Sequence, residues 1–172
     1  LCSIWSHEGA TAGPPDLFLV QELVRTPGEV CTLERSAFGA GWNSVVTPSV
    51  ATAGPAGLAG KSAGAAILAQ RPGGLLAYGD SPGIGSAPYP GRVAAAVWPA
   101  VLSRGILVVS VFLFHGEGLS DRNLALLYYL VRLVRAARCP FVIGGDFQIN
   151  PNSLEASGLP LQLVAVVVAP SK

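Results

Sequence analysis

The chain has 172 residues, of which 51% are hydrophobic and only 12% are charged. This length and apolar content support one substantial hydrophobic core and are too small for two ordinary domains, so residues 1–172 are predicted to form a single domain. The formal net charge of +1 excludes binding of nucleic acid through overall charge, and such a contact would need a local basic patch.

The three cysteines, Cys2, Cys31 and Cys139, are odd in number and widely spaced, which favours a reducing, intracellular compartment and no disulfide framework.

The longest apolar runs are far shorter than the roughly 20 residues that span a bilayer, so no membrane span is expected. Residues 1–10 lack the features of a secretory signal. Because the chain contains no methionine, it is expected to be a fragment of a longer protein. No oligomeric state is indicated.

Taken in chain order, two stretches rich in Ala, Gly, Ser and Pro, 50–64 and 78–91, predict loops. The first contains PAGLAGKS, which is similar to a phosphate-binding loop. However, Pro55 removes a backbone donor where that loop requires its first glycine. The apolar residues 65–68 then indicate a buried strand where a helix would be needed, so Lys61 is interpreted as a loop cation.

Residues 106–114 predict a strand, and one clear helix is predicted after it. Ser120 can cap this helix through Asn123. Its apolar face has three-and-four spacing and consists of Leu126, Leu127, Leu130, Val131, Val134 and Ala137. Three arginines in the last turns, Arg132, Arg135 and Arg138, complement the negative end of the helix dipole.

The segment 141–151, FVIGGDFQINP, carries the strongest functional signal. Its bulky start and its two glycines predict a buried strand that a ligand or a second backbone can approach closely. An ionised Asp146 at the rim of such a strand must be paired, hydrogen-bonded or bound to a cation. It is therefore either a metal-binding or catalytic acid, or a cap for the turn that follows. With the preceding strand and helix, this segment forms a βαβ-like succession that favours α/β layers.

The motif GGDFQINP resembles the GDFN-type motif of the endonuclease/exonuclease/phosphatase superfamily, which includes DNase I, apurinic endonucleases and retrotransposon endonucleases. Three other segments match that family in order. Residues 15–23 resemble its strand that ends in Gln-Glu, 61–68 its SGGVAIL strand, and 106–114 its central strand. The resemblance implies a DNase I-like four-layered α/β sandwich, with two packed mixed β-sheets flanked by helices, that is incomplete at both ends.

The resemblance also implies an activity, that of a Mg²⁺- or Mn²⁺-dependent phosphodiesterase acting on nucleic acid, most similar to retroelement endonucleases. Glu22 matches the Glu that holds the metal, and Asp146 matches the Asp that helps to activate the nucleophile. Gln148 stands where the family has a phosphate-contacting Asn, and Asn150 is a possible substitute. Hard oxygen ligands of this kind suit Mg²⁺ or Mn²⁺ rather than Zn²⁺.

Two further positions depart from the family pattern. Phe112 stands where the family has a substrate-contacting Tyr and lacks its hydroxyl group. His115 falls where relatives often carry an Asn. It is either a polar group of the catalytic site or an ordinary loop histidine at a strand end. His7 is interpreted as a surface residue.

The family's N-terminal Asn and its C-terminal Ser-Asp-His segment have no counterpart, because residues 1–13 contain no asparagine and no acid or histidine follows Glu155. A loss of several orders of magnitude in activity is expected by analogy with other hydrolytic triads. The sequence therefore predicts a truncated, impaired endonuclease. Two alternatives remain open. One is a catalytically inactive module that binds nucleic acid or a protein through the loop face and the helix arginines. The other is an unrelated α/β protein with coincidental motifs.

Overall fold

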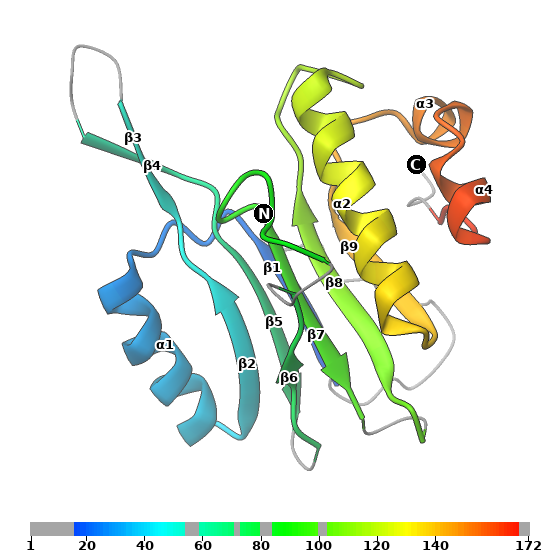
Figure 1. Ribbon diagram of the computed structural model, residues 1–172. Coiled ribbons are helices and arrows are strands. Elements are labelled where there is room, and N and C mark those ends of the chain that lie inside the picture. The colour runs from blue at the N-terminus through cyan, green and yellow to red at the C-terminus, as the bar shows by residue number, and fades with distance from the viewer. Residues whose placement is uncertain (1–15, 54–58, 71–72, 80–83, 100–102, 169–172) are drawn as a thin grey trace, which may run out of the picture.

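A computed structural model of the chain describes residues 16–53, 59–70, 73–79, 84–99 and 103–168. The predictions for Cys2, His7 and Pro55 fall outside these residues. Two β-sheets pack against each other, and each carries a long helix on its outer side (Figure 1). These helices are α1 (Pro27–Gly39) and α2 (Asp121–Ala137). The result is the four-layered α/β arrangement expected from the sequence.

The first sheet has three antiparallel strands in the order β1 (Leu17–Gln21), β5 (Ala65–Gln70) and β2 (Trp42–Thr47). The second sheet has four strands in the order β6 (Leu76–Ala77), β7 (Val93–Trp98), β8 (Ile106–Phe112) and β9 (Phe141–Asp146). Within it β8 and β9 are parallel, as a βαβ unit through α2 requires. A separate hairpin consists of β3 (Val50–Ala53) and β4 (Ala59–Ser62).

The second sheet is apolar on both faces because it lies between the first sheet and α2. Along β8, Val108 packs toward the first sheet, and Leu107, Val109 and Val111 pack into the larger core beneath α2. Successive side chains of a strand point to opposite faces, so an unbroken apolar run is what a strand buried on both sides requires. This explains the run ILVVSVF in the sequence.

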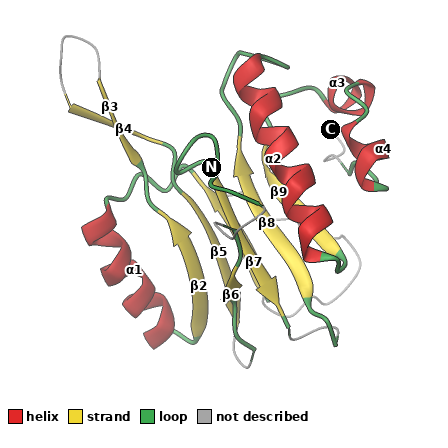
Figure 2. Ribbon diagram, viewed as in Figure 1, coloured by secondary structure: helices red, strands yellow, loops and turns green. Residues whose placement is uncertain are grey.

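The expected helix and its N-cap are confirmed. Ser120 Oγ accepts a hydrogen bond from the backbone N–H of Asn123 at 3.3 Å. Leu126, Leu130 and Leu133 are fully buried. Two short helices, α3 (Pro151–Ala156) and α4 (Leu159–Leu163), follow β9, and Figure 2 shows them near α2. No described helix is long and apolar enough to cross a membrane.

Two expectations were wrong. Residues 50–64 were expected to form a loop, but they contain the β3–β4 hairpin, because the pairing of two strands through their backbones needs no large side chains. Lys61 therefore lies in a strand and is not a loop cation. β9 is only partly buried, with Val142 49% exposed, because β9 is the edge of its sheet. The structure also contains α1, α3 and α4, which are helices that the sequence pattern did not reveal.

The start of α1 gives a testable pH dependence. Glu29 accepts hydrogen bonds from the backbone N–H and the hydroxyl of Thr26 at 2.7 and 2.8 Å. The backbone bond is the main reason that the pKa of Glu29 falls from 4.5 to about 2. Because the pKa is lower in the folded state, this stabilisation is complete above pH 4.5 and is lost as the pH falls toward 2.

We therefore expect Glu29→Gln to lower the melting temperature near pH 7, and the difference from the unmodified chain to shrink steadily between pH 4.5 and pH 2. Thermal melts at several pH values measure this difference. Glu34→Gln, at mid-helix, controls for the change in charge. A difference that does not depend on pH would contradict the proposed role of the Glu29 carboxylate.

Candidate active site

Glu22 and Asp146 are brought to the same edge of the sandwich, where β1, β8 and β9 end. Buried Ser110 in β8 links the two sheets there: its Oγ donates to Val20 O at 3.0 Å and accepts from Gln21 Nε2 at 2.9 Å. Glu22 follows directly after β1, and Asp146 pairs in register with Phe112 at the end of β8. The two acids that the motifs singled out are therefore delivered by strands whose ends are fixed to one another.

A cavity of about 370 Å³ lies at this edge, and three of the predicted site residues line it. Its walls include Glu22, Lys61, Ser62, Arg92, Phe112 and His115. Glu22 has a left-handed backbone conformation, with φ 56°. Such a conformation is uncommon for a residue other than glycine, and residues that adopt it cluster at functional sites.

Asp146 and Gln148 are joined to His115 by a chain of hydrogen bonds. Asp146 Oδ1 accepts from the backbone N–H of Gln148 at 3.2 Å, and Asp146 Oδ2 accepts from Gln148 Nε2. Gln148 Oε1 lies 2.6 Å from His115 Nδ1. The turn-capping role considered for Asp146 is therefore present in the structure. The same contacts also connect Asp146 to a residue of the cavity wall.

Asn150, which was expected to contact phosphate, lies outside the cavity wall at the start of α3. It is the N-cap of α3, where its Oδ1 accepts from the backbone N–H of Asn152 at 2.9 Å. It is exposed and does not line the cavity. The side-chain oxygen of Asn150 therefore already makes a structural contact, and its amide NH₂ group makes no hydrogen bond within the described residues.

Arg92 is a central residue of the site that the sequence analysis missed. Its guanidinium group is buried and donates to the carbonyl oxygens of Phe112 and Leu113 at 3.2 and 3.1 Å, and to Ser62 Oγ at 3.4 Å. Burial lowers the pKa of Arg92, and the nearby charge of Arg122 lowers it further, whereas Glu117 and Glu22 act in the opposite direction. The only signal in the sequence is a lone arginine that directly precedes the apolar strand 93–98.

The two arginines share one aromatic ring. The guanidinium carbon of Arg92 lies 3.6 Å from the centroid of Phe114, and that of Arg122 lies 4.1 Å from it. Tyr89 packs edge-on against Phe114, with ring centroids 5.0 Å apart. Glu117 pairs with Arg122 and offsets part of the positive charge. Cation–π contacts of this kind are strongest where the cation is shielded from water, which applies to the buried Arg92 of the cavity wall.

The loop that carries His115 is held by Asn123, which is fully buried. Asn123 Oδ1 accepts from Phe114 N at 2.8 Å, and its Nδ2 donates to Phe114 O at 3.1 Å and to Gly118 O at 2.8 Å. One side chain thus replaces the strand partners that the backbone loses where β8 ends. His115 itself is exposed and lies at the mouth of the cavity.

The residues at this edge of the sandwich suit a divalent cation that is held by one protein carboxylate, that of Glu22. The described residues contain no group of three or more His, Cys, Asp or Glu side chains placed to hold a metal together. Mg²⁺, however, commonly keeps several waters and binds through one or two carboxylates together with substrate phosphates. The Glu22 carboxylate, exposed beside the cavity and without a hydrogen bond or ion pair among the described residues, suits that mode.

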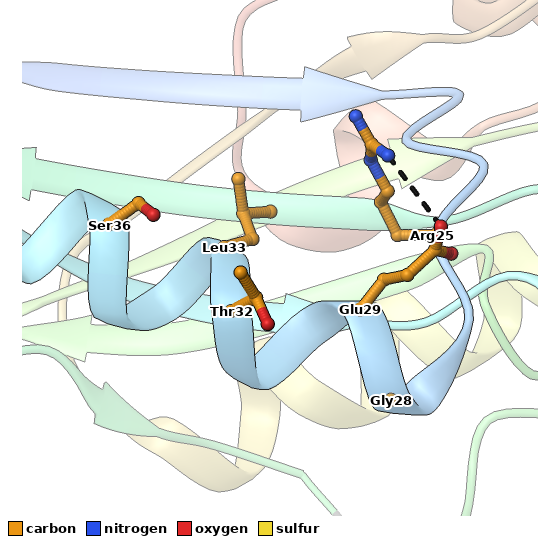
Figure 3. Close-up of a pocket in the computed structure, with 6 residues that line it drawn as sticks. All are labelled: Arg25, Gly28, Glu29, Thr32, Leu33 and Ser36. Carbon is orange, nitrogen blue, oxygen red and sulfur yellow. Dashed lines mark ion pairs between the residues drawn. The ribbon is translucent and has the colours of Figure 1, made fainter.

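A second cavity, of about 340 Å³, lies along α1 (Figure 3). Arg25 and Glu29 form an ion pair of 3.7 Å at one end of it, and Thr32, Leu33 and Ser36 continue along the helix. None of the residues predicted to take part in catalysis lies there. The cavity at the ends of β1 and β8 is therefore the candidate active site.

Two sheets packed face to face, with parallel β8 and β9 and an outer helix on each side, define the DNase I-like fold of the endonuclease/exonuclease/phosphatase superfamily. The chain has this fold. No protein-family model matches the chain, and no curated protein matches it in sequence.

Several solved structures are similar to this chain in fold. The 2′,3′-cyclic phosphatase ANGEL2, in complex with adenosine-2′,3′-vanadate, is similar with a TM-score of 0.60 and 19% identity over 85% of this chain and 43% of that one. A 3′-5′ exonuclease from Neisseria meningitidis has a TM-score of 0.56 and 19% identity over 88% of this chain and 60% of its own. The human Nocturnin catalytic domain with bound sulfate has a TM-score of 0.50 and 13% identity over 84% of this chain and 56% of its own. The chain thus spans roughly half the length of each.

The role of Asn123 can be tested directly. Asn123→Ala should lower the free energy of unfolding by about 2–4 kcal/mol, because the buried polar groups of Phe114 and Gly118 lose their partner. Urea denaturation measures the loss. Asn152→Ala, at an exposed position in α3, should change the stability by less than about 0.5 kcal/mol. Equal effects of the two substitutions would show that Asn123 does not hold the loop.

Proposed function

We propose that this domain belongs to a divalent-metal-dependent phosphodiesterase that cleaves nucleic acid internally, as an endonuclease. The observation that supports this most directly is the convergence at one cavity. Glu22, Phe112 and His115 line it, and Asp146 and Gln148 connect to it through His115. These residues come from three separate segments of the sequence, around Glu22, around Phe112 and around Asp146, and each segment resembles a motif of the same superfamily.

Glu22 would hold Mg²⁺ or Mn²⁺, and the bound metal would neutralise phosphate charge and make a water molecule more acidic. Asp146 helps to activate the attacking water, and its oxygens keep lone pairs beyond the two that Gln148 engages. The second N–H of Gln148 Nε2 is a donor for a phosphate oxygen. His115 supplies a further polar group at the cavity mouth.

Substrate binding involves the remaining predicted residues. Phe112 forms an apolar wall, with the guanidinium group of Arg92 at 4.9 Å from its ring centroid, and lacks the hydroxyl hydrogen bond of a tyrosine. The free amide NH₂ group of Asn150 is a second donor toward the substrate. A nucleic acid substrate is in keeping with the activities named for ANGEL2 and for the Neisseria exonuclease, a cyclic phosphatase and a 3′-5′ exonuclease. The GGDFQ motif adds a resemblance to retroelement endonucleases.

A binding module without catalysis is the second candidate, and one observation favours it. The three arginines at the end of α2, Arg132, Arg135 and Arg138, are all exposed and available to a phosphate backbone. Contacts with phosphates supply most of the affinity of non-specific nucleic acid binding. In this reading the DNase I-like fold is kept but the cavity performs no chemistry.

Nicking of supercoiled plasmid in Mg²⁺ or Mn²⁺ distinguishes the two candidates. We expect slow nicking by the unmodified chain and a loss of about 100-fold or more in both Glu22→Ala and Asp146→Ala, because each removes a group that acts on the reacting atoms or the metal. Glu155→Ala, which removes an exposed acid on α3, should leave the rate unchanged. Absence of nicking by every version would favour the binding module.

Metal binding can be measured apart from catalysis. A ligand that binds only the folded state raises the melting temperature, and the rise increases with the logarithm of the ratio of ligand concentration to Kd once the ligand is in excess. We expect millimolar Mg²⁺ or Mn²⁺ to raise the melting temperature of the unmodified chain and of Glu155→Ala, and to have no effect on Glu22→Ala. An unchanged melting temperature of the unmodified chain in both metals would rule out the assignment of Glu22.

A further inference from the structure

We propose that Gln148 fixes the tautomer of His115, so that Nδ1 carries the ring proton and Nε2 is a proton acceptor at the mouth of the cavity. This inference deepens the proposed function and takes its catalytic meaning from it. Gln148 is in this role a positioning residue that acts through His115. The hydrogen-bonding capacities of three side chains lead to this assignment.

The orientation of the Gln148 amide follows from its contact with Asp146. An ionised carboxylate has lone pairs but no hydrogen to donate. The atom of the Gln148 side chain that faces Asp146 Oδ2 must therefore be the NH₂ nitrogen, as the structure has it. The backbone N–H of Gln148 donates to the other oxygen of the same carboxylate, at 3.2 Å, and keeps the amide in place.

The tautomer of His115 then follows from the amide. With its nitrogen turned to Asp146, Gln148 presents its carbonyl oxygen to the ring, 2.6 Å from Nδ1. A carbonyl oxygen can only accept, so Nδ1 must donate a proton. In the neutral ring the other nitrogen, Nε2, then has a lone pair. No hydrogen bond within the described part of the chain engages Nε2.

The position of His115 is suited to the use of that lone pair. The residue is exposed at the cavity that Glu22, Arg92 and Phe112 also line. Its loop is fixed on the N-terminal side, because Asn123 bonds both the N–H and the carbonyl oxygen of Phe114. The ring is thus held by its own backbone and by Gln148, while Nε2 remains accessible.

The proton transfer that this arrangement permits can be written in full. As a water oxygen forms its bond to phosphorus, one O–H bond of that water breaks and the proton passes to His115 Nε2, so that Asp146 helps to activate the water through Gln148 and His115. The P–O bond to the leaving group breaks, and its electron pair stays on the leaving oxygen, which takes a proton from solvent. The imidazolium keeps its Nδ1–H bond to Gln148 throughout. A base oriented in this way contributes to hydrolysis in many enzymes.

Nitrogen-15 NMR of the imidazole ring tests the tautomer without any reference to activity. The chain contains two histidines, so His7→Gln leaves His115 as the sole histidine signal. At a pH where the ring is neutral, long-range ¹H–¹⁵N correlation should show a protonated Nδ1 and an unprotonated Nε2. In Gln148→Leu the Nε2–H form, which prevails in histidine side chains that lack such a contact, should return. Gln162→Leu, an exposed glutamine in α4, should keep the original pattern.

Gln148→Asn provides a second variant in case the leucine disturbs the fold. Gln148 has φ 51°, a conformation that asparagine tolerates well, and the shorter side chain would no longer reach His115. It too should lose the fixed Nδ1–H tautomer. An Nε2–H ring in the parent chain, or an Nδ1–H ring retained in both variants, would overturn the proposal.

The outcomes separate this inference from the proposed function. If the plasmid is nicked, Gln148→Leu should lower kcat by about tenfold or more with a smaller change in KM, and Gln162→Leu should not. A fixed Nδ1–H tautomer in a chain that does not nick DNA would support the positioning contact and count against the endonuclease assignment. Nicking with the opposite tautomer would support the endonuclease and overturn the role of Gln148.

Discussion

The candidate site depends on how the chain is held where β8 ends, and the buried guanidinium group of Arg92 is bonded at that point. Backbone carbonyls that leave a sheet inside a protein must find donors. Arg92 donates to two of them, at Phe112 and Leu113, and reaches Ser62 in the neighbouring hairpin. A buried cation without such partners would be strongly unfavourable. The position of Arg92 and the end of β8 therefore determine each other.

Two further buried side chains, Asn123 and Ser110, fix the backbone next to the other residues of the cavity. Asn123 fixes the residue before His115, and Ser110 links β8 to β1 just before Glu22. Each of these two polar side chains is fully buried and has its hydrogen bonds satisfied by neighbouring elements. Exposed residues such as Glu22 and His115 consequently sit on a rigid frame. Chemistry at a protein surface requires this combination of accessible groups and a fixed backbone.

The sequence predicted the parts of this structure that depend on local pattern. The βαβ unit follows from an apolar run, a helix with an N-cap at Ser120 and a second strand, and the four motifs pointed to the layered fold. The α1 helix was missed because only Val30 of its side chains is buried, so it has little apolar periodicity. The β3–β4 hairpin was missed because its strands are poor in large side chains. Arg92 was missed because its partners are backbone carbonyls about twenty residues away, which no local pattern reveals.

The two interpretations of Asp146 that the sequence left open turn out to be compatible. A carboxylate that caps a turn is usually read as structural, since its lone pairs are taken up by nearby N–H groups. Here one of those groups belongs to the side chain of Gln148, and the same amide reaches His115 with its oxygen. The carboxylate that caps the turn is thus also connected, through the Gln148 side chain, to His115 of the cavity wall. An asparagine at 148 would place its amide one methylene closer to the backbone, so the longer arm of glutamine is what allows this contact.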